Sequence, residues 1–295
     1  MEMKKHIVLI NAHAHTRKIK KLLAEMEDTF RKQHFSYAFY TTKDTDNAIH
    51  IMQTQKEPCR FYICGGDGTL HQAVHTLLHT AHEVVLLPCG TGNDFSRMLY
   101  DHKDVFAHFR KSLNQQAQAI DILQVNDTEC INAACFALDH DIANHVHDTN
   151  WHLIPRKLAY LMTVLRRIFV YSYPILSITL DGKKIFEGKA IFATCNNARF
   201  YGGGFCMTPN ALLQDGKMDI CIIEGFSRWK IIPKCPALLT KQPQKLKECH
   251  LYQGKEAIIH TNQGVNLDGE IYQDQDVHIK VLPQAFQLVN ELKSF

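Results

Sequence analysis

Short apolar runs alternate with amphipathic segments over the first 124 residues of the chain. The apolar runs are rich in β-branched and aromatic residues and predict strands at residues 6–10, 36–40, 61–64, 83–87 and 119–123. Helical spacing predicts helices at residues 16–33, 44–53, 70–79 and 93–112, with Asp44 and Thr69 as caps. Strands that alternate with helices indicate an α/β domain with a doubly wound, mostly parallel sheet.

The pattern changes after this region, because strands then follow one another. Apolar runs predict strands at residues 174–180, 183–187, 190–196, 217–224 and 277–282. Asp181-Gly182 and Asp268-Gly269 are typical of tight hairpin turns. Helical stretches at 154–170 and 228–239 interrupt the strands. We therefore expect domains at 1–124 and 125–283, the second mostly antiparallel β, with the chain end 284–295 as a candidate to return to the first domain.

Composition excludes several classes of protein. A chain of 295 residues with 45% hydrophobic residues is long enough for two packed domains. The formal net charge of +3 provides no dense basic field for nucleic acid, although a mildly positive patch for anionic membrane stays open. Residues 1–5 are charged and no apolar leader follows, and the ten cysteines form no CxxC pair. These features predict a cytoplasmic protein with reduced cysteines.

Residues 158–171 form the most membrane-like segment of the sequence. Arg166 and Arg167 interrupt it, and it is shorter than the roughly 20 apolar residues that a membrane-spanning helix needs. We expect a helix buried between elements or domains, and a helix lying on a lipid surface is the alternative.

The run Gly65-Gly66-Asp67-Gly68-Thr69 joins a buried strand to a helix. Glycines let backbone amides approach an anion closely, and the helix start adds free N–H groups and the positive end of its dipole. Asp67 suits such a site when a divalent cation lies beside the phosphate. The segment is neither a Walker A loop nor GxGxxG, and an ordinary turn with a solvated Asp67 is the alternative.

A second glycine-rich turn follows the next strand, at Gly90-Thr91-Gly92-Asn93-Asp94. Ligands of open α/β sheets bind outside the carboxyl ends of the strands, so both turns are expected to face one crevice. One nucleotide could contact both turns.

The order GGDGT and then PxGTGNDF resembles the catalytic domain of the diacylglycerol kinase and sphingosine kinase superfamily, and most of all the small bacterial diacylglycerol kinases. Further matches run nearly to the end of the chain at Asn132, Asp139, Ile142, Ala159-Tyr160, Tyr201-Gly202-Gly203-Gly204, Pro209-Asn210-Ala211, Asp215-Gly216-Lys217-Met218-Asp219 and Asp268-Gly269-Glu270. The resemblance implies a fold related to that of NAD kinase.

The resemblance also implies a set of nucleotide-binding residues. They are Asn11, Ala12, His13, Ala14, His15, Thr42, Gly65, Gly66, Asp67, Gly68, Thr69, Leu70, His71, Gly90, Thr91, Gly92, Asn93 and Asp94. ATP with Mg²⁺ is the expected nucleotide.

Asp268-Gly269-Glu270 acquires a catalytic meaning from the resemblance, although a plain hairpin turn is the alternative. Phosphoryl transfer to an alcohol needs a base near the hydroxyl and a metal to neutralise phosphate charge. The resemblance implies that Glu270 is the base and that Asp268 orients it or helps hold the catalytic metal.

The loop before the strand at 217–224 resembles a structural Mg²⁺ loop of the family. Asp215 and the carbonyls of Leu212 and Lys217 are the candidate ligands, since hard cations prefer oxygen. An ordinary solvated loop is the alternative.

The chain also departs from the family pattern. Asn11-Ala12-His13-Ala14-His15 replaces Asn-Pro-x-Ser-Gly, and His71-Gln72 replaces Asn-Glu after the first glycine turn. Ala137 replaces a glycine and His140 an alanine. The helical spacing of His71, His75 and His79 invites a zinc interpretation, but no Cys or carboxylate completes a tetrahedral set in the sequence there.

Together these features predict an ATP-dependent lipid kinase with its active site between the two domains. Diacylglycerol would be converted to phosphatidic acid in phospholipid metabolism, with transient, peripheral docking on the membrane. The alternatives are an NAD kinase and a non-catalytic lipid- or nucleotide-binding homologue. A homodimer is left open.

Overall fold

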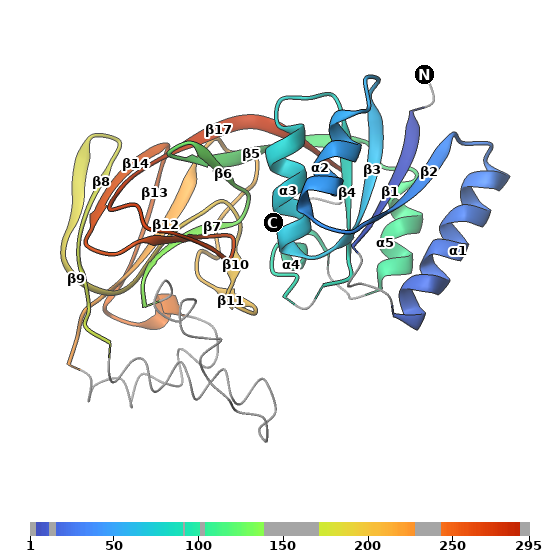
Figure 1. The fold of residues 1–295 in the computed structure, drawn as a ribbon. Coiled ribbons are helices and arrows are strands. Elements are labelled where there is room, and N and C mark those ends of the chain that lie inside the picture. The colour runs from blue at the N-terminus through green and yellow to red at the C-terminus, as the bar shows by residue number, and fades with distance from the viewer. Residues whose placement is uncertain are drawn as a thin grey trace.

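A computed structural model describes residues 4–11, 16–90, 92–100, 104–138, 171–227 and 243–289. Figure 1 shows two halves side by side, with the helices in one and antiparallel strands in the other. Strands β5 (Ala117–Val125) and β17 (Asp276–Val289) run along the top of both halves. The expected combination of a mostly parallel α/β half and an antiparallel β half is confirmed.

The first half is built on four parallel strands in the order β2-β1-β3-β4. They are β1 (Lys5–Asn11), β2 (Tyr37–Thr42), β3 (Cys59–Gly65) and β4 (Glu83–Pro88). The helices are α1 (Arg17–Lys32), α2 (Thr45–Gln53), α3 (Asp67–Leu77), α4 (Ser96–Leu99) and α5 (Val105–Ser112).

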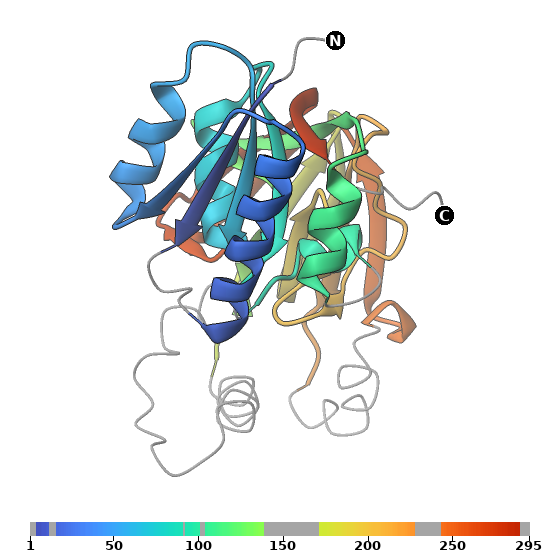
Figure 2. The ribbon, with the colours of Figure 1, turned by 90° about the vertical axis from the view of Figure 1, so that its right-hand side faces the viewer.

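Helices cover both faces of this sheet (Figure 2). Ile7 and Phe61 pack with α2 and α3, whereas Val8 and Tyr62, one position later on each strand, pack with α1 and α5. Both faces are therefore buried, which explains why these strands read as continuous apolar runs.

Two expectations about the helices were wrong. The predicted helix at 93–112 is divided, because Tyr100 is extended and ends α4, and Asp104 caps α5 by accepting a hydrogen bond from the Phe106 amide. Thr69 is not a cap, because α3 begins at Asp67 with Gly66 as its N-cap. Asp44 is confirmed as the cap of α2 through a bond from the Asn47 amide at 2.8 Å.

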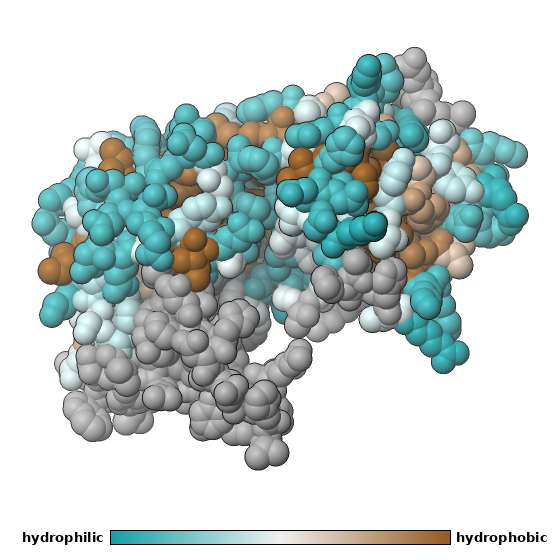
Figure 3. Space-filling view, viewed as in Figure 1, coloured by the Kyte–Doolittle hydropathy of each residue, from teal (hydrophilic) through white to brown (hydrophobic). Residues whose placement is uncertain are grey.

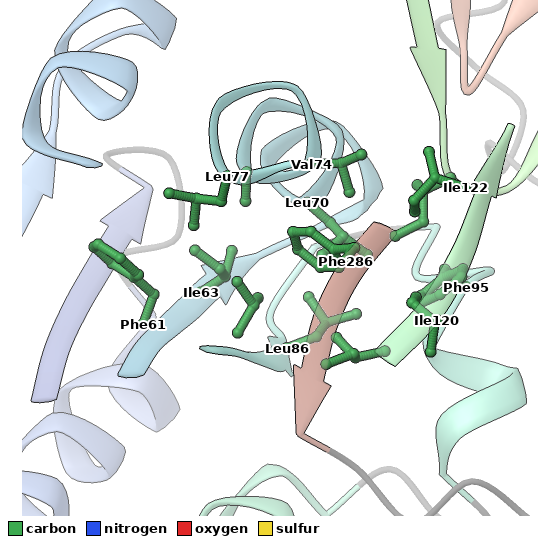
Figure 4. Packing of buried hydrophobic residues seen from close by; sticks show 14 of the residues in the cluster. Phe61, Ile63, Leu70, Val74, Leu77, Leu86, Phe95, Ile120, Ile122 and Phe286 are labelled. Carbon is green, nitrogen blue, oxygen red and sulfur yellow. The ribbon is translucent and has the colours of Figure 1, made fainter. Parts of the chain in front are cut away.

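The fifth predicted strand does not extend the parallel sheet. β5 pairs antiparallel with β17, and the end of β17 pairs parallel with β4 through Leu288 and Val84. Figure 4 shows Phe286 of β17 beneath α3, beside Leu70 and Val74. A strand from the chain end thus fills the place that sequence order assigns to β5.

The second half is antiparallel throughout the described strands. Its elements are β6 (Thr128–Cys130), β7 (Ala133–Ala137), β8 (Ile175–Leu180), β9 (Lys183–Asn196), β10 (Phe200–Tyr201), β11 (Phe205–Cys206), β12 (Met218–Glu224), the 3₁₀ turn Pro243–Lys245, β13 (Cys249–Gly254), β14 (Glu256–Thr261), β15 (Val265–Leu267) and β16 (Glu270–Tyr272).

The two runs predicted at 183–187 and 190–196 form one long strand, β9, which pairs with β8, β7 and β12. Both predicted hairpin turns are confirmed: Asp181-Gly182 joins β8 to β9, and Asp268-Gly269 joins β15 to β16, all with positive φ. The predicted helices at 154–170 and 228–239, and the segment 158–171 apart from Tyr171, lie outside the described residues.

Within the described ranges, no helix is both long and apolar enough to cross a bilayer. Figure 3 shows a mostly hydrophilic face on which hydrophobic residues gather in several separate groups.

A buried histidine makes the first half sensitive to acid. The His6 ring contacts the Tyr62 hydroxyl at 3.0 Å and stacks on Phe35. Burial, with the charge of Arg60, lowers its pKa from 6.5 to about 4. Because the folded state resists protonation, the unfolding free energy falls as the pH drops from 6.5 towards 4.

We expect His6→Gln to remove about 2 kcal/mol of the loss in unfolding free energy between pH 7.5 and pH 5. Urea denaturation at the two pH values measures it, with exposed His50→Gln as control. An equal loss in wild type and His6→Gln would contradict this assignment.

Candidate active site

The parallel strands bring the predicted nucleotide residues to one edge of the sheet. Asn11 and Thr42 end β1 and β2 as register partners. Gly65 and Pro88 end β3 and β4 in the same way. Asn11 Nδ2 donates to Thr69 Oγ1 at 3.3 Å, which joins the first strand to the start of α3.

The two glycine turns touch through their backbones. A Cβ atom on Gly90 would lie 2.7 Å from the Gly66 Cα of the other turn. Within the first turn, a Cβ atom on Gly65 would lie 2.6 Å from Thr69 Oγ1. The amides of Cys89 and Gly90 both donate to the Gly65 carbonyl, at 2.8 and 3.2 Å. Only glycine allows this approach.

Gly68 differs from these glycines, because a Cβ atom there would meet nothing within 4 Å. It lies in the first turn of α3, where free N–H groups and the helix dipole favour an anion. The open space beside Gly68 is therefore suited to a phosphate group.

Asp67 connects the first turn to the second. Its carboxylate accepts hydrogen bonds from the amides of Asp94 at 3.0 Å and Phe95 at 3.3 Å. Burial raises the pKa of Asp67, as do the nearby Asp94 and Asp268 carboxylates, while the two amides act in the opposite direction. A buried carboxylate among others is a suitable neighbour for a cation.

Asn93 shapes the second turn with a left-handed backbone, φ 52°. Its Nδ2 donates to the Gly90 carbonyl at 2.6 Å, and its Oδ1 is buried without a hydrogen-bond partner. Gly92 packs against Asp67, since a Cβ there would lie 3.1 Å from Oδ2.

Asp94 reaches across to the second half. Its Oδ2 accepts from the Gly203 amide at 2.7 Å, and its Oδ1 accepts from Arg97 Nε at 3.0 Å. In the same segment, the Tyr201 hydroxyl accepts from Asn266 Nδ2 at 3.0 Å. The motif Tyr201-Gly202-Gly203-Gly204 matched the family pattern but received no role from the sequence. Its three consecutive glycines are the feature that could have predicted a close backbone contact.

Asp268 lies at the junction, by which we mean the contact between α3 and the second half of the molecule. Its side chain is only 2% exposed and accepts several hydrogen bonds. It accepts from the amides of Ile131, Asn132 and Ala133 at 2.8 to 3.0 Å. The Cys130 thiol donates to Oδ1 at 3.3 Å. These contacts favour an orienting role over metal binding.

His71 approaches the same carboxylate from the first half, with Nδ1 3.1 Å from Asp268 Oδ2. Burial opposes the charge on both groups. Even so, Asp268, with Glu270 and Glu129, raises the pKa of His71 above its ordinary value. The His71 bond and charge, with the Ala133 and Ile131 amides, hold the pKa of Asp268 below its ordinary value.

Glu270 begins β16 and is exposed to solvent. The Tyr272 hydroxyl donates to its Oε2 at 3.3 Å. The Gly269 amide donates to Asn266 Oδ1 at 2.9 Å, which closes the turn before it. The candidate base is thus accessible, and the turn that carries it is bonded to α3 through Asp268 and His71.

Two family models cover most of the chain. Residues 5–125 match the diacylglycerol kinase catalytic domain, and residues 133–290 match the YegS C-terminal NAD kinase β-sandwich-like domain. A probable lipid kinase YegS-like from Shewanella frigidimarina is 30% identical over 245 residues, which cover 78% of this chain and 76% of that protein. The chain belongs to the diacylglycerol kinase and YegS-like lipid kinase family.

A further relative agrees with this assignment, and solved structures show the fold. A diacylglycerol kinase of Mycobacterium tuberculosis (strain H37Rv) is 25% identical, covering 83% of this chain and 82% of its own. The solved structure of a diacylglycerol kinase from Bacillus anthracis has a TM-score of 0.74 at 20% identity, covering 98% and 97% of the two chains. An NAD kinase from Archaeoglobus fulgidus in complex with ATP matches at 0.55 and 11%, covering 98% and 94%. The NAD-kinase-like fold is thereby confirmed.

Some of the remaining nucleotide-binding candidates lie outside the described residues, and others are buried. Ala12, His13, Ala14, His15 and Thr91 lie outside the described residues. Leu70 is fully buried in the core, and its amide donates to the Gly66 carbonyl at 3.1 Å, so its role is to fix the start of α3. Thr42 is buried and donates to the Ile10 carbonyl at 3.3 Å.

Where the sequence departs from the family pattern, the structure shows what the substituted side chains contact. Gln72 Nε2 donates to Thr45 Oγ1 on α2 at 2.9 Å. His75 pairs with Glu129 at 2.7 Å, so it and His71 contact different carboxylates. Ala137 adopts φ 65°, the left-handed conformation that explains a glycine in the family pattern.

The candidate Mg²⁺ loop is held partly by protein contacts. Asp215 accepts from the Lys217 amide at 3.1 Å and from Gln253 Nε2 at 2.9 Å, and Leu212 is 42% exposed. Buried Asp121 accepts from the amides of Gly216 and Gln284 at 2.7 and 2.8 Å.

The buried carboxylate of Asp219, beside this loop, is suited to a nearby cation. Its Oδ2 is buried without a partner, and burial, with the Asp215 charge, raises its pKa to about 6. Within the described ranges, no cluster of three or more His, Cys, Asp or Glu side chains could hold a metal. The residues fit a hard cation bound by one carboxylate and carbonyls.

The contrast between Gly90 and Gly68 generates a prediction. We expect Gly90→Ala to lower the unfolding free energy by about 1–3 kcal/mol, because its methyl group collides with Gly66.

The methyl group of Gly68→Ala meets no protein atom, so this variant should preserve stability but weaken ATP binding by about tenfold. Urea denaturation and isothermal titration calorimetry measure the two effects. Unchanged ATP affinity in Gly68→Ala would contradict a phosphate at this position.

Proposed function

We propose that this protein is an ATP-dependent lipid kinase that transfers the γ-phosphoryl group to a lipid hydroxyl, most favourably from ATP to diacylglycerol to give phosphatidic acid. The observation that carries the proposal is the hydrogen bond between His71 and Asp268. It joins the phosphate-binding helix to the turn that bears Glu270. A phosphate donor site and an accessible base therefore meet at one junction.

Nucleotide binding is supported by the geometry of the first half. The start of α3, the space beside Gly68 and the touching glycine turns suit the phosphates of ATP. Gly65, Gly66, Gly90 and Gly92 are closely approached by other protein atoms, so the open position beside Gly68 is the one that we assign to a phosphate.

Glu270 takes the proton of the lipid hydroxyl as that oxygen bonds to the γ-phosphorus. The bond between the γ-phosphorus and the β–γ bridging oxygen breaks, and ADP leaves with the bridging oxygen. Catalysis of this kind depends chiefly on positioning and charge stabilisation. Asp268 orients the base through its buried contacts.

Mg²⁺ bound with ATP would neutralise phosphate charge. Asp67 would hold it, and its position as the first residue of α3 supports this role. Asp215, with the carbonyls of Leu212 and Lys217, would hold a structural Mg²⁺ at the loop before β12.

The acceptor is a membrane lipid, so the protein acts in phospholipid metabolism as a cytoplasmic protein that docks transiently on the membrane surface. Its function does not include nucleic acid. The docking on the membrane follows from the substrate class, because diacylglycerol resides in the bilayer. A homodimer is a separate proposal, which this function does not require.

The decisive measurement is transfer of labelled γ-phosphate from ATP with Mg²⁺ to dioleoylglycerol in mixed micelles. We expect labelled phosphatidic acid from wild type and at least about 100-fold less from Glu270→Gln. The matched control is Glu256→Gln, which alters an exposed carboxylate on β14 and should leave the rate unchanged.

Other outcomes of this assay redirect the proposal. Labelling of a different lipid keeps the mechanism and changes the acceptor. Labelling of NAD in place of any lipid would establish an NAD kinase, and ATP binding without turnover would indicate a non-catalytic homologue.

The structural Mg²⁺ site has its own test. At Mg²⁺ about 100-fold above its Kd, binding should stabilise the wild type by about 2.7 kcal/mol, or about 5 °C in Tm. We expect Asp215→Asn to lose this shift and exposed Asp274→Asn to keep it, measured by calorimetry with and without EDTA. A full shift in Asp215→Asn would exclude Asp215 as a ligand.

A further inference from the structure

The pairing of His71 with Asp268 joins two side chains that are distant in the sequence. The two side chains are 11% and 2% exposed, so the contact is largely shielded from water. They belong to opposite halves: His71 lies on α3 and Asp268 on the turn between β15 and β16. A shielded contact with a charged acceptor is stronger than its exposed counterpart.

Each end of this contact is attached to a functional group by a short, rigid path. Asp67 and His71 are four residues apart on α3, so one helical turn separates the phosphate-binding end from the His71 ring. Glu270 follows Asp268 by two residues, across a turn closed by the bond from Gly269 to Asn266. The position of the His71 ring therefore bears on the distance from phosphate to base.

The remaining bonds of Asp268 come from the second half. Ile131, Asn132 and Ala133 donate their amides, and Cys130 donates its thiol. These bonds locate the turn relative to the second half, but not relative to the nucleotide. The His71 bond is the contact of Asp268 that crosses to α3.

Building on the proposed function, we propose that His71 is a positioning residue that sets the separation between the phosphate-binding start of α3 and the Glu270 carboxylate. The ring acts as a donor to Asp268 and takes no proton from the substrate. Its loss would leave both binding surfaces in place and misalign them. A misplacement of about 1 Å between reacting groups costs about 100-fold in rate.

Histidine at this position has a competing role that experiment separates from positioning. With Nδ1 bonded to a carboxylate, Nε2 could act as a proton acceptor. Asparagine distinguishes the two roles, because its Nδ2 is bonded to Cγ as histidine Nδ1 is, and it has nothing that corresponds to Nε2. His71→Asn thus keeps the donor to Asp268 and removes the base.

His75 provides a matched control one turn further along α3. It also pairs with a carboxylate of the second half, Glu129 on β6, at 2.7 Å. Its side chain is 59% exposed, and Glu129 has no part in the turn that carries Glu270. A general loss of contacts between the halves would affect both histidines, whereas of the two only His71 bonds to the turn that carries Glu270.

The kinetic test compares wild type with His71→Ala, His71→Asn and His75→Ala in the lipid phosphorylation assay. We expect His71→Ala to lower kcat by about 100-fold, with the KM for ATP within about twofold of wild type. His71→Asn should recover at least about tenfold of that loss, and His75→Ala should match wild type. Failure of His71→Asn to recover any activity while ATP binding is intact would overturn positioning in favour of proton transfer.

Hydrogen exchange supplies a readout that does not depend on lipid phosphorylation. In His71→Ala, the amides of Ile131, Asn132, Ala133 and Gly269 should exchange faster than in wild type, while His71→Asn and His75→Ala keep wild-type protection. If wild type phosphorylates no lipid, the proposed function fails and this comparison alone decides the positioning role. Unchanged protection in a folded His71→Ala variant would overturn it.

Discussion

The buried carboxylate of Asp268 is the interaction on which the junction depends. Removing a carboxylate from water costs several kcal/mol, and hydrogen bonds to a charged group return about 1.5–3 kcal/mol each. Three amides, a thiol and His71 converge on it, so the 130–133 segment, the β15–β16 turn and α3 all contribute to accommodating the charge. The hairpin turn therefore becomes a rigid support for Glu270.

A second constraint acts at the phosphate end of the same junction. The glycine turns meet backbone to backbone at Gly66 and Gly90, and Asp67 bonds to the amides that follow the second turn. Asp94 then carries the connection to Gly203. Two carboxylates near Asp67, those of Asp94 and Asp268, thus bond across the two halves and bring the candidate site residues together.

The departures from the family pattern do not have equal weight once their surroundings are known. Gln72 bonds to Thr45 on the neighbouring helix, away from the glycine contact, and Ala137 accepts a left-handed backbone. His71 is different, because it enters the network that supports Glu270. One residue of α3 is thereby bonded to the opposite half of the molecule.

Local pattern determined most of the elements of this protein and the residue types that meet at its candidate site. Alternating apolar runs predicted the four parallel strands, and Asp44 and the Asp-Gly pairs predicted a cap and two hairpins. The glycine turns predict a phosphate at one edge of the sheet, and this stays a prediction. The tertiary structure alone decided that β17 lies beside β4, that Asp94 meets Gly203 and that His71 meets Asp268. These last two contacts join residues 109 and 197 positions apart, and burial selected them by requiring partners for charges removed from water, a requirement that no local pattern expresses.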